Sequence, residues 1–180
     1  MSNGPMHGQV NGAVNGQGRP DVEPGDPDGL DVVLATTPLQ VEAAYDVRTK
    51  VFVDEQGVPP ELEMDAQDDH ADHLLATRDG RPVGAGRLVV EPAGFAGADP
   101  TLGDVAHLGR LAVLPDARGT GLGVALVRAV EARAAERGLV LVVLAAQTHA
   151  LGFYERLGYE PYGDVFDDAG LPHRMMRKHL

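Results

Sequence analysis

The sequence contains no cysteine and no tryptophan, and its only serine is Ser2. Without cysteine the chain has no disulfide, no thiolate metal ligand and no cysteine nucleophile. A serine-centred triad is excluded as well, because Ser2 lies in a segment too poor in hydrophobic residues to belong to a core. Covalent catalysis through cysteine or serine is therefore outside the chemistry of this chain.

Basic residues and long apolar runs are also scarce. The chain has 15 Lys and Arg against 27 Asp and Glu, a formal net charge of −12. A protein that grips nucleic acid through its phosphates needs a basic stripe, so we expect no nucleic-acid partner, and the acidity weakly favours a cationic one. No run approaches the roughly 20 apolar residues that span a bilayer, and the first residues lack the features of a secretory signal. We therefore expect a cytoplasmic protein without a membrane partner.

The composition divides the chain into two parts. Residues 1–29 are dominated by Gly, Asn, Pro, Asp and Gln, which predicts a disordered tail. Residues 30–180 are long enough to form one domain that buries roughly two thirds of its unfolded surface. We predict a single folded domain over 30–180.

Hydrophobic periodicity and turn signals predict a mixed α/β fold. Helices are expected over 37–51, 122–137 and 148–157, the first beginning with a capping box at Thr37. A polar loop is expected over 54–72, and turns at Asp79-Gly80 and Ala169-Gly170. The apolar run over 139–146 is typical of a strand buried on both faces, as in parallel pairing. The other expected strands cover 31–35, 73–78, 82–90, 104–114, 159–165 and 173–179.

A glycine loop, Arg118-Gly-Thr-Gly-Leu-Gly123, lies between a predicted strand and a predicted helix. Such a loop turns backbone amides inward, and the helix start adds about half a positive charge, which suits a phosphate or pyrophosphate. An ordinary glycine turn is the other interpretation. The P-loop and dinucleotide patterns do not fit, because no Lys-Ser/Thr follows the last glycine and the spacing is not G-x-G-x-x-G.

Two motifs together resemble the GCN5-related N-acetyltransferases (GNAT family). Arg118-x-x-Gly121-x-Gly123 is similar to the acetyl-CoA pyrophosphate loop of that family, and Ala150-x-x-Phe153-Tyr154-x-x-x-Gly158-Tyr159 is similar to its helix-to-strand signature. The resemblance extends to a bacterial subgroup of largely unassigned acceptor, and covers nearly everything from Asp31 onward. It is carried there by Val51-Phe52-Val53-x-Glu55-Gln56-x-Val58-Pro59, Glu63-x-Asp65-x-x-Asp68 and Gly170-Leu171-Pro172-His173.

The resemblance implies a fold, a co-substrate and a set of binding residues. The fold would be a mixed, mostly antiparallel central sheet flanked by helices, with a splayed parallel strand pair that admits the thioester of acetyl-CoA. Tyr154 would protonate the departing thiolate, and Gln147 stands near the place where many members have an asparagine that contacts pantetheine. The remaining cofactor-binding residues would be Leu111, Ala112, Val113, Arg118, Gly119, Thr120, Gly121, Gly123, Val124 and Arg156.

Several residues are candidates for the acceptor side. Glu55 has two interpretations: it orients or deprotonates an amine, or it only ends a helix. His173, at the start of the last predicted strand, is either a residue of the acceptor side or without a role in the reaction. His107 is expected to be a core histidine more readily than a base, and Arg110 to be paired with a carboxylate. The acidic run from Glu61 to His73 is interpreted first as a solvated loop, second as a rim for a cationic acceptor and last as a metal site, because it lacks a known ligand spacing.

These observations predict an enzyme that transfers an acetyl group from acetyl-CoA to a primary amine by direct attack in a ternary complex. A non-catalytic acyl-CoA sensor of the same fold is the alternative, and a nucleotide-binding protein is the third possibility. The acceptor remains open between small amines and protein amines. Dimers are common among the proteins that the chain resembles, and the sequence leaves the oligomeric state open.

Overall fold

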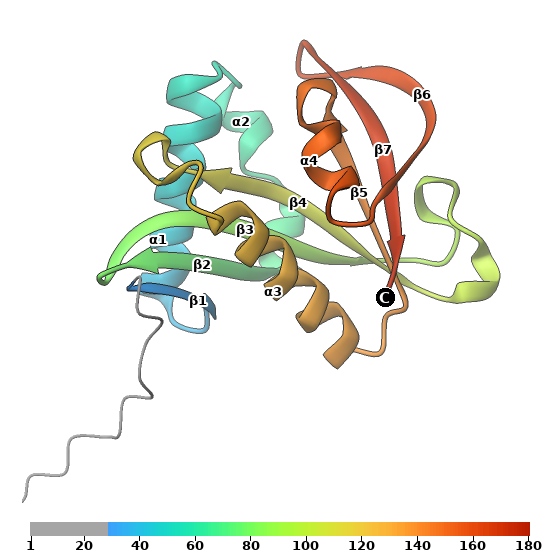
Figure 1. The fold of residues 1–180 in the computed structure, drawn as a ribbon, viewed down its shortest axis with the longest axis horizontal. Helices are drawn as coiled ribbons and strands as arrows, with labels where there is room; N and C mark the ends of the chain where they lie inside the picture. Colours follow the sequence, from blue (N-terminus) through green and yellow to red (C-terminus); the bar gives the residue numbers. More distant parts are fainter. Residues whose placement is uncertain (1–28) are drawn as a thin grey trace, which may run out of the picture.

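A computed structural model of the protein describes residues 29–180 and shows a mixed α/β fold around one central sheet (Figure 1). The sheet has seven strands in the order β1-β2-β3-β4-β5-β7-β6, with helices on both faces. The predicted tail over residues 1–29 lies outside the described residues, Gly29 excepted. Within residues 29–180, no helix has the length and apolar character needed to cross a membrane.

The helices and strands fall close to their predicted positions. The strands are β1 (Leu30–Leu34), β2 (Asp72–Arg78), β3 (Arg81–Glu91), β4 (Val105–Val113), β5 (Leu141–Gln147), β6 (Glu160–Asp168) and β7 (Leu171–His179). The α-helices are α1 (Pro38–Arg48), α2 (Pro60–Glu63), α3 (Leu122–Glu136) and α4 (Leu151–Glu155). A π-helical turn η1 (Thr49–Glu55) continues α1, and short 3-10 turns are η2 (Ala66–His70), η3 (Phe95–Gly97), η4 (Pro100–Leu102), η5 (Pro115–Ala117) and η6 (Thr148–Ala150).

The start of α1 shows how directly local sequence sets an element. The Thr37 side chain accepts a hydrogen bond from the Gln40 backbone amide at 3.3 Å, and the Gln40 side chain accepts one from the Thr37 amide at 3.1 Å. This reciprocal arrangement satisfies two amide donors that a helix start leaves without partners. The predicted capping box is confirmed.

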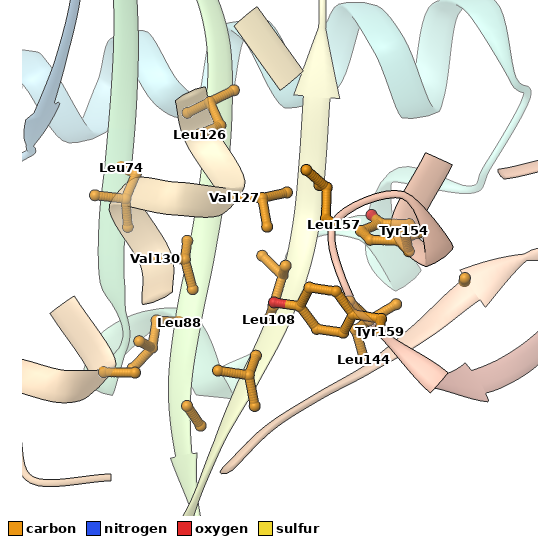
Figure 2. Packing of buried hydrophobic residues seen from close by; sticks show 14 of the residues in the cluster. Leu74, Leu88, Leu108, Leu126, Val127, Val130, Leu144, Tyr154, Leu157 and Tyr159 are labelled. Atoms are coloured by element: carbon orange, nitrogen blue, oxygen red, sulfur yellow. The ribbon is translucent and has the colours of Figure 1, made fainter. Parts of the chain in front are cut away.

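Side chains that alternate along the strands divide the core into two layers. Leu74 faces α3 and packs with the cluster that contains Leu126 and Val130, as Figure 2 shows. The next residue, Leu75, faces the opposite side and packs with Ala44 and Val47 of α1. Because successive strand residues point to opposite faces, the sheet is held between α3 on one side and α1 on the other.

The sheet opens between its two central strands. β4 and β5 run parallel and pair only at Ala106 with Val142 and at His107 with Val143. Beyond that point β5 stays paired with β7 on its other side, up to Gln147 opposite His173, while β4 turns away (Figure 1). All other strand pairs are antiparallel. The predicted mostly antiparallel sheet with a splayed parallel pair is confirmed.

Candidate active site

A cavity of about 460 Å³ occupies the opening between β4 and β5. Beyond His107 the β4 edge has no β5 partner, so its backbone groups are free to pair with an extended ligand. The cavity has three sides. The charged side is formed mainly by Glu63, Arg87, His107 and Arg110, and the apolar side by Phe52, Val58 and Leu62. The third side comes from the C-terminal part of the chain, through Ala145, Gln147, Tyr154 and His173.

A β-bulge shapes β4 beside the cavity. Ala85 pairs with Ala112 and Arg87 with Gly109, so β4 carries one more residue than β3 between these positions. Arg110 lies in the bulge with a φ of 52°, in the left-handed region that non-glycine residues seldom adopt. Such bulges bend a strand and re-aim its side chains, and a residue of this kind inside a strand points to a functional constraint.

Part of the acidic run that follows η1 is buried and paired, so the expectation of a solvated loop holds only for exposed members such as Glu61 and Asp69. Glu63 is 2% exposed and Asp68 is 9% exposed. The fully buried Arg48 donates to the Glu63 carboxylate at 2.6 Å and to the Asp68 carboxylate at 2.7 Å, and Arg87 donates to Asp68 at 2.9 Å. Within residues 29–180, no group of three or more His, Asp or Glu is arranged to hold a metal ion.

These pairs keep the buried Asp68 carboxylate ionised. Burial by itself raises the pKa of the Asp68 carboxyl, but hydrogen bonds from Arg48 and Arg87 outweigh burial and leave that pKa well below its ordinary value. The loop is therefore a fixed wall of the cavity, and its negative charges are already matched by arginines.

Arg110 fastens this wall to β4. Its guanidinium lies 2.9 Å from the Glu63 carboxylate and 3.0 Å from the Asp65 carboxylate, and it donates to the Leu62 carbonyl at 3.0 Å. The expected pairing of Arg110 with a carboxylate is confirmed. The bulge thus positions the side chain that holds the C-terminal end of α2 over the cavity.

Tyr154 of α4 points its ring into the core beside the cavity. It is 8% exposed, lines the cavity and makes edge contacts with Phe153 and Tyr159, with ring centroids 4.9 and 5.8 Å away. Figure 2 shows its hydroxyl at the margin of the hydrophobic cluster. Burial raises the pKa of the Tyr154 phenol, so the hydroxyl stays protonated at neutral pH and can donate a hydrogen bond.

His173 and Gln147 lie side by side on β7 and β5 and both line the cavity. The His173 Nδ1 lies 2.8 Å from the Leu171 carbonyl, which makes Nδ1 the donor and leaves Nε2 as an acceptor. Gln147 donates to the Gln56 side chain at 3.0 Å. This amide contact joins the end of η1 to the far side of the cavity.

His107 also lines the cavity, at the point where β4 and β5 separate. Its side chain is 21% exposed, and its Nδ1 lies 3.4 Å from the buried carboxylate of Glu91. The Phe95 ring lies 5.0 Å from the imidazole. His107 is therefore mostly buried and paired, as expected of a core histidine, and it also borders the cavity.

The glycine loop lies outside the cavity lining, at the start of α3. Gly119 and Gly121 have φ values of 76° and 85°, which only glycine adopts without strain, and a side chain at either would meet no neighbour. No side chain caps this 15-residue helix, so its first amide groups remain available for an anion. Glycine is favoured at position 123 for a different reason, since a Cβ there would lie 3.4 Å from the Phe153 ring.

Arg118 and Glu55 face each other at the edge of the glycine loop. The Arg118 guanidinium donates to both carboxylate oxygens of Glu55 at 2.8 and 2.6 Å, and to the Val113 carbonyl at 3.0 Å. Hydrogen bonding from Arg118 lowers the pKa of the Glu55 carboxyl. Glu55 is not among the residues that line the cavity, and the structure pairs it with Arg118.

The other predicted binding residues divide between the cavity and its surroundings. Leu111 lines the cavity, Ala112 and Val113 pack into the core on opposite faces of β4, and Val124 and Arg156 are exposed outside the lining. The Thr120 hydroxyl accepts a hydrogen bond from Arg78 at 2.9 Å. Sequence reasoning missed Arg78 and Arg87, because only the fold brings β2 and β3 beside these sites.

Comparisons with known proteins give a consistent result. The family model described as "Acetyltransferase (GNAT) domain" matches residues 35–180. An uncharacterized N-acetyltransferase of Bacillus subtilis, YjcF, is 35% identical over 150 residues, which cover 83% of this chain and 99% of the relative.

Solved structures share the fold. An acyl-CoA N-acyltransferase from Pseudomonas aeruginosa is 32% identical and superposes with a TM-score of 0.67 over 83% of this chain and 97% of its own. The acyl-homoserine lactone synthase BjaI, solved with isopentyl-CoA, is 21% identical with a TM-score of 0.60, over 78% of this chain and 75% of its own, and that likeness shows the fold alone.

Proposed function

The chain belongs to the GNAT family of acetyltransferases, and on that premise we propose that it transfers an acetyl group from acetyl-CoA to a primary amine by direct attack in a ternary complex. The observation that carries this proposal is the open β4 edge, which borders a cavity that is also lined by the buried Tyr154. A covalent route through cysteine is closed because the chain has none.

The residues present suit acetyl-CoA as a co-substrate. The free amides of the glycine loop and of the α3 start suit a pyrophosphate, with Arg118 and Thr120 beside them. The edge of β4 from Leu111 to Val113 has no β5 partner, although Arg118 donates to the Val113 carbonyl, and it suits the amide groups of an extended pantetheine arm. Gln147 faces the same cavity. Exposed Arg156 would reach a further phosphate of the cofactor.

Tyr154 supplies the proton for the leaving sulfur in this proposal. Its phenol is protonated because burial raises its pKa, and burial in apolar surroundings also raises the pKa of a thiol held beside it. A proton can pass from the phenol to the sulfur as negative charge develops there during cleavage of the C–S bond. His173, whose Nε2 is free to accept, is the residue named by the sequence for the acceptor side.

Calorimetry with acetyl-CoA, followed by a thiol-release assay across a panel of amines, tests the proposal. Since the protein has no cysteine, every thiol detected comes from CoA. We expect acetyl-CoA to bind, ATP not to compete, and thiol release to require an amine. Absence of acetyl-CoA binding would refute the proposal, competition by ATP would favour a nucleotide-binding protein, and binding without amine-dependent release would favour an acyl-CoA sensor.

A further inference from the structure

We propose that His107 and Glu91 form a histidine–carboxylate dyad in which His107 is the catalytic base that takes the proton of the acceptor amine. This inference rests on the proposed acetyl transfer and assigns its proton acceptor. The two residues are separated by 15 others in the sequence, and the antiparallel pairing of β3 with β4 brings them together near the inner end of the cavity.

The geometry gives each imidazole nitrogen a separate task. Nδ1 faces the Glu91 carboxylate at 3.4 Å, so Nδ1 carries the proton and Nε2 is the acceptor. Within residues 29–180, Nε2 has no hydrogen-bond partner. The Nδ1 contact is long, as catalytic hydrogen bonds often are before substrate binds.

Glu91 is itself held in place, which makes it a positioning residue. It is 8% exposed, and the Gln67 side chain donates to its carboxylate at 2.7 Å. Phe95 packs against the imidazole from a third side. A base whose ring is oriented by a fixed carboxylate keeps the correct tautomer and gains stabilisation when it becomes an imidazolium.

Burial, with a smaller contribution from two nearby cations, keeps His107 neutral at rest. Burial lowers the pKa of the imidazole, and the cations Arg87 and Arg110 add to this effect against the opposing pull of Glu91. Glu91 and Arg87 lie on β3 and Arg110 lies on β4, and the buried Glu63 lines the same cavity. A neutral imidazole is the form that accepts a proton, so the ring is ready to act at neutral pH.

His173 lacks this arrangement, although it lines the same cavity. Its Nδ1 is oriented by the backbone carbonyl of Leu171, and its ring stacks on Phe166 with centroids 6.0 Å apart. Within the described chain no carboxylate pairs with it, so an imidazolium there would gain no ionic partner. The dyad favours His107 as the base and leaves His173 to line the acceptor side.

The step balances as follows. The nitrogen lone pair of the neutral amine forms a bond to the thioester carbonyl carbon, and Nε2 of His107 takes the proton that the nitrogen gives up. The C–S bond breaks with its electron pair on sulfur, which receives the proton of Tyr154. The imidazolium returns its proton to solvent and the phenolate regains one, so the products are the amide and CoA.

Rates of thiol release at saturating acetyl-CoA, measured against pH, test the dyad. His107→Asn keeps an N–H donor for Glu91 but removes Nε2, and we expect kcat/KM for the amine to fall about a hundredfold or more with loss of the acidic limb. Glu91→Gln removes the charge that raises the His107 pKa, so the limb should move to lower pH. His179→Asn, at an exposed histidine near the end of β7, is the control and should change neither kcat/KM nor the pH profile.

Three further measurements separate the possible failures. Calorimetry should give the same acetyl-CoA affinity for His107→Asn within about twofold, and thermal unfolding should show that each variant folds. Long-range ¹H–¹⁵N NMR should show an Nδ1-protonated His107 in the free protein. An active wild type whose pH profile survives His107→Asn but is lost in His173→Asn would overturn the dyad alone, whereas a wild type that binds acetyl-CoA without turnover would overturn the proposed transfer as well.

Discussion

Some side chains at this site would take part in the reaction and others hold their neighbours in place. Tyr154 belongs to the first group in the proposed reaction. Tyr154 lines the cavity, and its ring is packed in aromatic contacts. Tyr154→Phe keeps those contacts and removes only the donor. A hydrogen bond to a charged group contributes about 1.5 to 3 kcal/mol, so we expect kcat to fall by about ten- to a hundredfold with little change in acetyl-CoA affinity.

Thiol-release kinetics and calorimetry check this prediction, with Tyr162→Phe as the control. Tyr162 has a buried hydroxyl without a partner in the described chain and lies outside the cavity lining, so its variant should retain full activity. An unchanged kcat in Tyr154→Phe would remove the acid role of this residue and leave acetyl-CoA binding untouched.

Glu55 allows a second prediction about a single residue, one that concerns cofactor binding and not the chemical step. In the free protein it occupies the guanidinium of Arg118, the side chain expected beside the pyrophosphate. Both side chains are about two-fifths exposed, and such pairs contribute about 0 to 1 kcal/mol. Glu55→Gln should therefore leave kcat unchanged and tighten acetyl-CoA binding by up to about fivefold.

Calorimetry at low and high salt measures this effect, which should shrink as salt screens the pair. Asp116→Asn breaks the exposed Arg81–Asp116 pair beside the same loop and provides the control, with no change expected. A loss of kcat of a hundredfold in Glu55→Gln would instead restore the sequence interpretation of this carboxylate as a base.

At the scale of helices and strands, α3 packs closely on the sheet at Gly84 of β3, where the strand has no side chain. A Cβ at Gly84 would lie 2.9 Å from Leu126 and 3.2 Å from both Leu122 and Ala76. Gly84→Ala should lower the free energy of unfolding by about 1 to 3 kcal/mol, because the helix must shift or its side chains must leave their rotamers.

Urea unfolding measures this cost against Gly86→Ala on the same strand. A Cβ at Gly86 would meet only ordinary contacts at 3.7 Å or more, so that variant should stay within about 0.5 kcal/mol of the wild type. Equal losses in both variants would show that the close approach of α3 at Gly84 is not the cause.

Most of these helices and strands could be predicted from local sequence signals. The features that the sequence could not predict depend on contacts between residues far apart in the chain. Thr37 with Gln40 and the Asp79-Gly80 turn act within a few residues, and the predicted helix and hairpin form there. The segment after η1 was expected to be a solvated loop, yet it contains α2 and a buried Asp68. Its burial depends on Arg48 and Arg87, whose pairing with it no local pattern encodes.

At the scale of the whole molecule, buried ion pairs should make stability fall in acid. Burial opposes the ionised form of Asp65, Asp68 and Asp72, but arginine hydrogen bonds outweigh it and lower the pKa of each. A carboxyl with a lowered folded pKa contributes stability above its unfolded pKa of about 3.9, and this is lost as the pH falls through the folded value.

We therefore expect urea unfolding to show little change from these groups between about pH 7 and 5 and a progressive loss below about pH 4. Asp68→Asn should cost about 2 to 4 kcal/mol at pH 7 and flatten the acid dependence, because it leaves two buried arginines short of a partner. The exposed neighbour Asp69 provides the control, and Asp69→Asn should change stability by less than about 0.5 kcal/mol. A wild-type acid dependence retained in Asp68→Asn would contradict this account.

The separation of β4 from β5 gives the protein a vulnerability in addition to the outer edges that β1 and β6 leave at the two ends of its sheet. It places an open strand edge in the middle of the sheet, and open edges invite pairing with other chains and aggregation. The Arg110 bulge and the Arg118 contact with the Val113 carbonyl cover part of this edge. An extended ligand on β4 would complete the sheet, so the protein should remain longest in solution, and resist aggregation best on storage, when CoA is present.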